Sequence, residues 1–324
     1  MSELRWHPLL QEWVITATHR QERTFHPPPE YCPLCPTKPG AIETEVPEPD
    51  YEIVVFENRF PSLLREPPPP SVAPAPFSPV RPSEGVCEVV LYTPDHHASL
   101  TDLPVERIEQ LIWVWRDRYA ALSARPEVQY VFIFENRGRE IGVTLSHPHG
   151  QIYAYPFIPP KLERERDAQR DYFAQHGRCL LCDIVAYELE SQARLVEVND
   201  LWVAFVPFFA RYPYEVYLVP RPHRGDLLAL DEDEISQLAR LLKRVLLRYD
   251  HLWGFPMPYV MAQHPCPCDG RDYPEWHFHI EFYPPYRTAD KLKYLAGSES
   301  GAGTFINDTL PEETARQLRE VPID

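Results

Sequence analysis

Ser146-His147-Pro148-His149-Gly150-Gln151-Ile152-Tyr153 is the stretch that decides how this chain folds and where its chemistry lies. Side chains two residues apart in a strand point to the same face of a sheet, which would place His147 and His149 together. Pro148 and Gly150 bend the run, so the two imidazoles can diverge. We therefore expect one histidine to bind a metal and the other to meet a substrate.

The composition and charge restrict the classes of protein to which the chain can belong. At 324 residues it is long for one domain and has enough apolar content for two cores. The net charge of −16 disfavours broad contact with nucleic acid or an anionic membrane, which are held by basic residues. The N-terminus lacks the apolar core of a signal peptide, and no run approaches the ~20 apolar residues of a membrane span. We therefore expect a cytoplasmic protein.

Four of the seven cysteines form two Cys-x-x-Cys pairs, Cys32–Cys35 and Cys179–Cys182. In a reducing cytosol such pairs hold metal more often than they form disulfides, so the pairs indicate zinc. Cys87 is expected to pack inside a strand, and Cys266 and Cys268 receive no role.

The two cysteine pairs each open a unit in which the same elements recur in the same order. A β-rich run follows each pair, at residues 51–59 and 195–205. A lone histidine comes next, His96 in one unit and His223 in the other, before a long amphipathic helix that spans 231–253 in the second unit. Each unit ends in an apolar strand that carries a His-x-His motif.

This repetition predicts an α+β fold of two tandem units, residues 1–172 and 173–324, each an antiparallel sheet packed with helices. The helix of the first unit is expected near 104–124, with Thr101 as its cap. The proline-rich residues 61–82 cannot sustain a helix or a central strand, and we interpret them as an insertion in the first unit.

Each unit offers ligands for a closed tetrahedral zinc site, two thiolates from the cysteine pair and two imidazoles from distant strands. The first set is Cys32, Cys35, His96 and His147. The second set is Cys179, Cys182, His223 and His277. A competing set of mixed carboxylate and imidazole ligands, which suit zinc or iron, is Glu165, His264, His277 and His279. His277 cannot easily serve both sets, and we favour the thiolate set.

If His147 faces the metal, His149 is left with the properties of a nucleophile. A neutral imidazole can attack an electrophilic phosphorus and form a phosphoramidate-type intermediate, which a second acceptor then resolves. Gly150 allows close approach of a substrate, and Gln151 can donate to a phosphoryl oxygen as charge develops.

These motifs resemble those of the galactose-1-phosphate uridylyltransferases, a branch of the histidine triad superfamily. The resemblance covers nearly the whole chain, through His264, the His277-Phe278-His279 segment and Phe282-Tyr283-Pro284-Pro285. The four segments that carry it are Cys32-Pro33-Leu34-Cys35, Pro94-Asp95-His96, Phe134-Glu135-Asn136-Arg137-Gly138 and His147-Pro148-His149-Gly150-Gln151-Ile152.

The resemblance implies two histidine-triad-like repeats, each a half-barrel, and a ping-pong reaction at His149. His149 would take the uridylyl group of UDP-glucose, release glucose 1-phosphate and pass the group to galactose 1-phosphate. It also implies a homodimer that shares its active sites, zinc in the first site, and zinc or iron in the second. The implied substrate contacts are Arg20 and Arg23 to the nucleotide phosphates, Asn58 and Arg59 to uridine, Asn136, Thr144 and Gln151 to the phosphoryl group, and Lys293 and Tyr294 across the dimer.

One segment departs from the family pattern and leaves alternatives open. The residues that would contact the hexose read Gly297-Ser298-Glu299-Ser300-Gly301-Ala302-Gly303-Thr304-Phe305-Ile306-Asn307-Asp308, a glycine-rich run that is hard to align. The nearest alternative is a nucleotidyl phosphorylase or adenylyltransferase that acts on ADP-glucose or a dinucleoside polyphosphate. A second alternative is a non-enzymatic zinc-binding module in which every histidine is structural.

Overall fold

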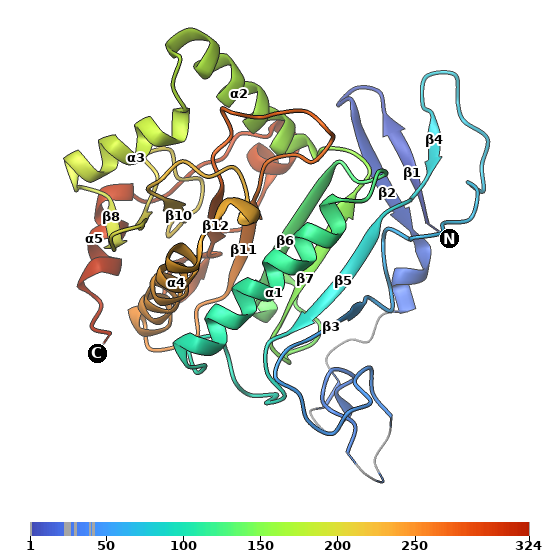
Figure 1. Cartoon of the computed structure of the whole chain (residues 1–324), viewed down its shortest axis with the longest axis horizontal. Coiled ribbons are helices and arrows are strands. Elements are labelled where there is room, and N and C mark those ends of the chain that lie inside the picture. The colour runs from blue at the N-terminus through green and yellow to red at the C-terminus, as the bar shows by residue number, and fades with distance from the viewer. Residues whose placement is uncertain (1, 23–26, 29–30, 39, 41–42, 324) are drawn as a thin grey trace.

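The computed structural model describes residues 2–22, 27–28, 31–38, 40 and 43–323, and its centre is one nine-stranded antiparallel sheet (Figure 1). Helices pack against the sheet, which confirms the predicted α+β class. The strand order is β3 (Val54–Glu57), β5 (Val86–Leu91), β7 (His149–Tyr155), β6 (Tyr130–Arg137), β11 (Tyr259–His264), β12 (His279–Tyr283), β10 (Val216–Pro220), β9 (Trp202–Phe205) and β8 (Leu195–Val198).

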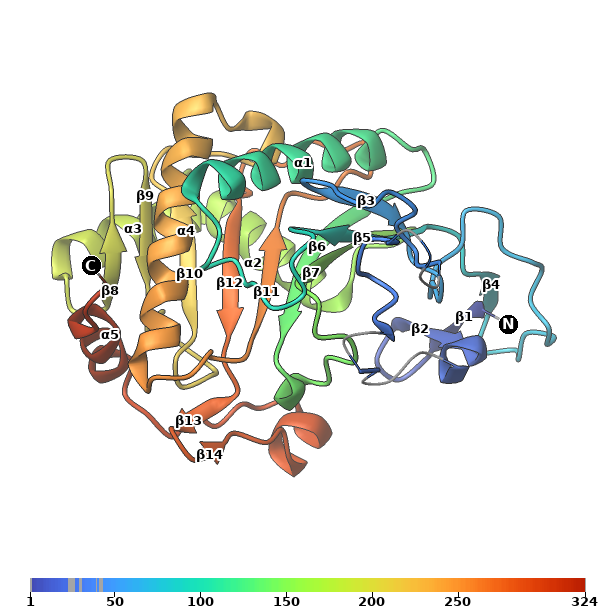
Figure 2. The ribbon, with the colours of Figure 1, turned by 90° about the horizontal axis from the view of Figure 1, so that it is seen from below.

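Two long helices, α1 (Val105–Ser123) and α4 (Glu232–Leu252), contact each other on one face of the sheet and run in different directions across it (Figure 2). Asp231 and Glu234 form a capping box at the start of α4, so this helix begins where its sequence predicts. The prediction that Thr101 caps α1 is wrong. Pro104 occupies the cap position, and the Thr101 hydroxyl donates instead to Asp250 of α4 at 3.1 Å.

The remaining elements surround the central sheet. The N-terminal strands form a separate three-stranded sheet, in which the predicted insertion supplies only the edge strand β4; the order is β2 (Glu12–Ala17), β1 (Ser2–His7) and β4 (Val80–Pro82). The peripheral elements that follow are α2 (Pro160–His176), α3 (Leu180–Ser191), β13 (Tyr286–Thr288), β14 (Lys291–Leu292) and α5 (Pro311–Glu320). Among the described residues, no helix is long and apolar enough to cross a membrane.

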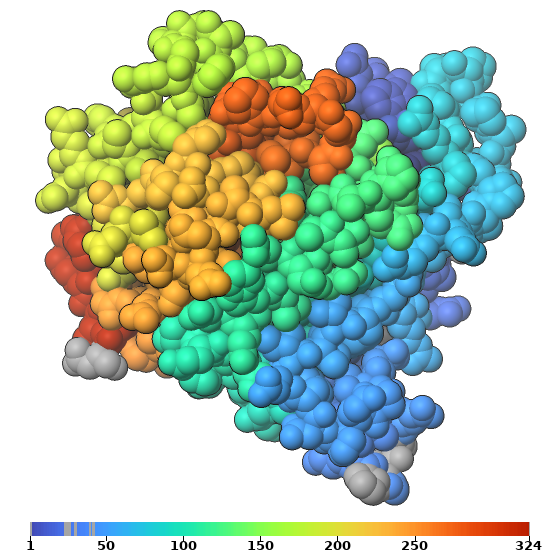
Figure 3. Space-filling view, viewed as in Figure 1, coloured from blue at the N-terminus to red at the C-terminus, as the bar shows by residue number. Residues whose placement is uncertain are grey.

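The two halves of the sequence meet inside the sheet, where β6 pairs with β11. One cluster of buried side chains runs beneath α1 and α4 across this seam, with Trp115 and Leu242 among its members. The space-filling view shows the blue-to-green half and the yellow-to-red half in close contact along these two helices (Figure 3). Ile152 of β7 and Ile280 of β12 therefore belong to one continuous core.

Candidate active site

The candidate nucleophile, His149, is the first residue of β7, which lies between β5 and β6. Ile152 and Ala154 of the same strand are fully buried in the core that α1 and α4 cover. Because side chains alternate across a strand, His149 and Gln151 point to the opposite face, away from those helices. His147 precedes the strand, so its imidazole is free to turn toward the Cys32–Cys35 pair.

Hydrogen bonding and burial prepare His149 for nucleophilic attack. Its Nδ1 lies 2.7 Å from the carbonyl oxygen of His147, so Nδ1–H donates to that oxygen and Nε2 keeps its lone pair. Burial lowers the pKa of His149 below its ordinary value of 6.5, which the His147 carbonyl opposes only in part. The imidazole is therefore neutral near pH 7, with its reactive nitrogen unprotonated.

A pocket opens in front of His149 and encloses about 690 Å³, part of it open to solvent. Apolar side chains such as Phe56 and Val89 form its walls. Five of the predicted substrate contacts line it, namely Arg20, Asn58, Arg59, Thr144 and Gln151. Asn136 lines an adjacent cavity that also reaches His149. Arg23 lies outside the described residues.

Gln151 is oriented by two neighbouring donors. The Asn58 amide and the Tyr153 hydroxyl donate to its Oε1, at 3.4 and 3.3 Å. The orientation of Asn58 is fixed in turn, because its Oδ1 accepts from the backbone N–H of Phe60 at 2.9 Å. With its oxygen occupied, Gln151 keeps its NH₂ group to donate to an anion in the pocket that it lines.

The four residues of the first predicted zinc set lie together beside the pocket. One potential ligand atom of each of Cys32, Cys35, His96 and His147 lies within 4.8 Å of the others. The Sγ of Cys35 is 3.4 Å from Nδ1 of His96 and 3.6 Å from Nδ1 of His147. His147 Nε2 lies 2.9 Å from the carbonyl of Thr93, which fixes the tautomer and leaves Nδ1 to face the thiolates.

The second half of the chain contains a cluster of the same design. Cys179, Cys182, His223 and His277 also place ligand atoms within 4.8 Å of one another. Nδ1 of His277 lies 3.7 and 3.4 Å from the two sulfur atoms, and its Nε2 lies 2.9 Å from the carbonyl of Pro220. In both clusters the donor set and the fixed imidazoles suit tetrahedral zinc.

A third cluster joins Glu165, His264, His279 and Glu281, and its membership differs from the competing set predicted from sequence. His277 lies with the thiolates instead, because it precedes β12, whereas His279 and Glu281 lie two residues apart on one face of that strand. Sequence reasoning missed Glu281, although this spacing from His279 was a usable signal. The Lys161 ammonium contacts Glu281 and lies 3.5 Å from Glu165, so a cation already lies among these carboxylates.

His279 occupies the position in β12 that His149 occupies in β7, but its surroundings differ. Its Nδ1 lies 2.9 Å from the carbonyl of His277, which repeats the arrangement at His149. Its Nε2, however, lies 3.3 Å from Glu281, the ring of Tyr217 stacks on it, and its side chain is 3 % exposed. His279 therefore has no free nitrogen that faces a pocket.

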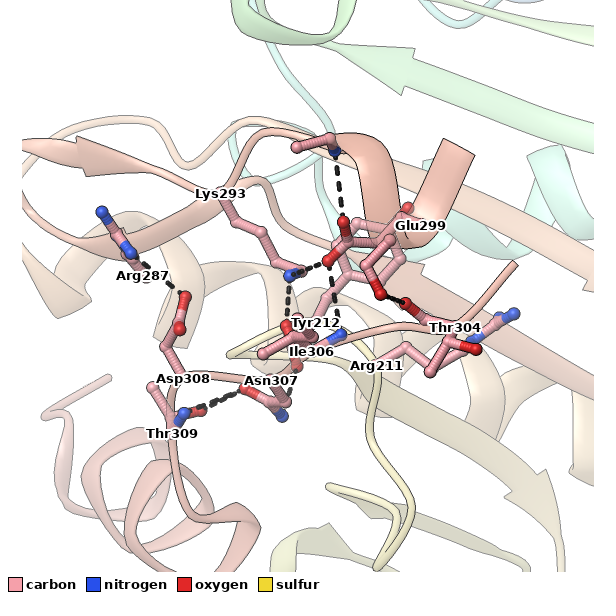
Figure 4. Close-up of polar contacts among 12 residues, drawn as sticks. Arg211, Tyr212, Arg287, Lys293, Glu299, Thr304, Ile306, Asn307, Asp308 and Thr309 are labelled. Atoms are coloured by element: carbon pink, nitrogen blue, oxygen red, sulfur yellow. Dashed lines mark hydrogen bonds and ion pairs between the residues drawn. The ribbon is translucent and has the colours of Figure 1, made fainter. Parts of the chain in front are cut away.

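The C-terminal segment that was expected to reach a substrate does not line the pocket of its own chain. Lys293 is buried, and its ammonium lies 3.1 Å from Glu299 and also contacts the carbonyl of Ile306 (Figure 4). The neighbouring Tyr294 is 75 % exposed. Neither Lys293 nor Tyr294 is among the residues that line the His149 pocket.

Comparison with known proteins gives matches along the whole length of the chain. The family models for the N-terminal and C-terminal domains of galactose-1-phosphate uridyl transferase match residues 1–159 and 165–324. A galactose-1-phosphate uridylyltransferase of Thermotoga maritima is 43 % identical over 326 residues, which is all of both chains.

Two further relatives bear on the fold and on the nucleotide base. A solved uridylyltransferase structure matches with a TM-score of 0.87 and 36 % identity, over 98 % of each chain. An ADP-glucose phosphorylase of Arabidopsis thaliana is 28 % identical and is matched over 99 % of this chain and 93 % of its own. The similarity thus extends to a relative that is named for an adenine nucleotide, but at lower sequence identity.

Proposed function

The chain belongs to the galactose-1-phosphate uridylyltransferase family, and on that premise we propose that His149 carries the uridylyl group between UDP-glucose and galactose 1-phosphate. The observation that supports this role most strongly is the hydrogen bond from His149 Nδ1 to the His147 carbonyl, at 2.7 Å. It leaves Nε2 as the nucleophilic atom at the pocket.

In the first half-reaction, the lone pair of Nε2 forms a bond to the α-phosphorus of UDP-glucose. The bond from that phosphorus to the bridging oxygen breaks, and glucose 1-phosphate leaves with the electron pair. The uridylyl-imidazole carries a positive charge, which the His147 carbonyl stabilises through Nδ1–H. In the second half-reaction, a phosphate oxygen of galactose 1-phosphate attacks the same phosphorus, and His149 leaves as a neutral imidazole.

The pocket supports this chemistry by position and charge. Gln151 can donate its NH₂ group to a non-bridging oxygen of the α-phosphate, with Thr144 and Asn136 beside the same histidine. Arg20 supplies positive charge for the phosphates, and Asn58 and Arg59, which line the same pocket, would contact the uridine. Both sugar phosphates are already ionised at pH 7, so the reaction needs positioning more than a general base.

We also propose that the chain consists of two tandem histidine-triad-like units, each of which binds one zinc ion. The sheet order supports two units, because β3-β5-β7-β6 is mirrored by β9-β10-β12-β11. Zinc would supply structural cross-links there, between a cysteine pair and the end of a strand. Because the carbonyl oxygen of His147 accepts from Nδ1 of His149, fixing His147 at the zinc would also restrict the movement of His149.

Metal analysis tests the two sites separately. We expect two zinc ions per chain, one fewer in Cys35→Ser and one fewer in Cys182→Ser. Glu281→Gln is the matched control for the carboxylate cluster, which already contains Lys161, and should keep both ions. A loss of metal from Glu281→Gln alone, with both cysteine variants fully loaded, would contradict the assignment.

We also propose that the enzyme is a homodimer in which the exposed Tyr294 enters the partner's pocket. Its 75 % exposure and the absence of Lys293 and Tyr294 from the lining of their own pocket support this arrangement. Mixing His149→Ala with Tyr294→Ala chains tests it, because each mixed dimer would contain one intact site and one site that carries both substitutions. Recovered activity is expected only after the subunits exchange, and its absence from verified mixed dimers would refute a shared site.

A further inference from the structure

Gly150, which separates His149 from Gln151, is in contact with a buried tyrosine on the helical side of the sheet. A methyl group at Gly150 would lie 2.2 Å from the hydroxyl oxygen of Tyr92, so that oxygen lies directly against the strand. Tyr92 follows β5, and in β6 the residue paired with Gly150 is Glu135. Side chains from both neighbouring strands therefore flank the backbone between the nucleophile and Gln151.

The carboxyl group of Glu135 connects this tyrosine to the second half of the chain. Its Oε2 accepts from the Tyr92 hydroxyl at 3.4 Å, and its Oε1 accepts from the Tyr259 hydroxyl at 3.2 Å. Tyr259 begins β11, and both tyrosines are fully buried. The three side chains form a clamp, Tyr92–Glu135–Tyr259, that spans the seam between the two halves of the sheet behind Gly150.

The charged side chains next to the clamp are those of Arg137 in β6 and Asp250 in α4. Arg137, two residues further along β6, lies over the Tyr259 ring at 5.5 Å and makes two hydrogen bonds to Asp250 of α4, at 2.8 and 2.9 Å. Burial raises the pKa of Glu135 to about 7, although Arg137 and the two hydroxyls lower it. An ionised carboxyl accepts from both tyrosines, whereas a protonated one gives up acceptor capacity to its own proton.

We propose that Glu135 is a positioning residue for the nucleophile, which it aligns by holding the Tyr92 hydroxyl against Gly150 from behind the sheet. The inference rests on the proposed role of His149 and adds to it a part for residues that touch no substrate. Small displacements of a reacting group are costly, since a shift of ~1 Å can reduce a rate about a hundredfold. A carboxyl that fixes the strand beside His149 therefore affects kcat more than substrate affinity.

Glu135→Gln tests this role in the full-length protein with UDP-glucose and galactose 1-phosphate. We expect kcat to fall about tenfold per active site, with KM for UDP-glucose unchanged, because the amide can replace only one acceptor. Active sites are counted from the amount of uridylyl adduct formed without acceptor. Tyr119→Phe is the matched control, since its buried hydroxyl donates to the Cys266 carbonyl at 3.3 Å, away from Gly150.

The pH profile of kcat separates positioning from a merely structural role. The wild type should gain activity as pH rises through about 7, when Glu135 ionises. In Glu135→Gln, which has no carboxyl at this position, the limb near pH 7 should be absent. Tyr119→Phe should keep the wild-type profile.

An unchanged kcat and an unchanged acid limb in folded Glu135→Gln would overturn the proposal. If that variant does not fold, Tyr92→Phe takes its place: a lower kcat at constant KM supports the clamp, and wild-type kinetics overturn it. A wild-type protein that forms no uridylyl adduct with UDP-glucose would be a different failure. It would refute the proposed function, and the positioning role with it.

Discussion

Gly150→Ala should inactivate the enzyme without unfolding it, and the structure sets the size of the effect. The new methyl group would lie 2.2 Å from the Tyr92 hydroxyl, whereas an ordinary contact is at least 1 Å longer. Tyr92 is held in the core and cannot move freely, so β7 must shift by about 1 Å relative to β5. A displacement of that size beside His149 predicts a loss in kcat of about a hundredfold.

Steady-state kinetics of Gly150→Ala, with a thermal unfolding curve for each protein, provides the assay. Gly225→Ala is the control, because its new methyl group would approach nothing closer than 3.8 Å. Removing the hydroxyl in Gly150→Ala/Tyr92→Phe leaves the ring carbon at 3.1 Å as the nearest atom, so kcat should recover toward that of Tyr92→Phe. Wild-type kcat in Gly150→Ala, or no recovery in the double variant, would refute this reasoning.

Two further predictions concern stability. Arg194→Met should lower the free energy of unfolding by about 3–5 kcal/mol in urea titrations, because it leaves the buried Glu188 carboxylate without the cation now 2.9 Å away; a change below 1 kcal/mol would show that Glu188 is neutral. In chelator-treated protein, burial lowers the pKa of His147 to about 4. The contribution of its neutral imidazole to the free energy of unfolding is therefore intact above pH 6.5 and is lost as pH falls toward 4, by up to about 3 kcal/mol. His147→Gln should lose this part of the pH dependence, and an unchanged slope in that variant would assign it to other groups.

The parts of the fold that depend on local chemistry could be predicted from the sequence. The apolar spacing of α4 is such a local signal, and it predicted a helix over 231–253 where the structure has Glu232–Leu252. The different orientations of His147 and His149 could also be predicted from the sequence, because a proline and a glycine flank His149 where the strand begins.

Tertiary pairing determined what could not be predicted. Thr101 has the residue type of a helix cap, but Asp250 of α4 takes its hydroxyl, and Pro104 begins the helix. The spacing of Glu281 from His279 could have placed these two residues together, but their grouping with Glu165 depends on how α2 packs beside β12. The pairing of β6 with β11 likewise depends on contacts far apart in sequence, which local patterns do not encode.

The most direct test of the central claim is the intact mass of the protein after brief mixing with UDP-glucose in the absence of galactose 1-phosphate. His149→Ala and ADP-glucose serve as controls for the nucleophile and the base. We expect a mass increase of one uridylyl group per chain in the wild type, none in His149→Ala, and its loss when galactose 1-phosphate is added. An adenylyl adduct from ADP-glucose in place of the uridylyl adduct, or a uridylyl adduct that persists in His149→Ala, would contradict it.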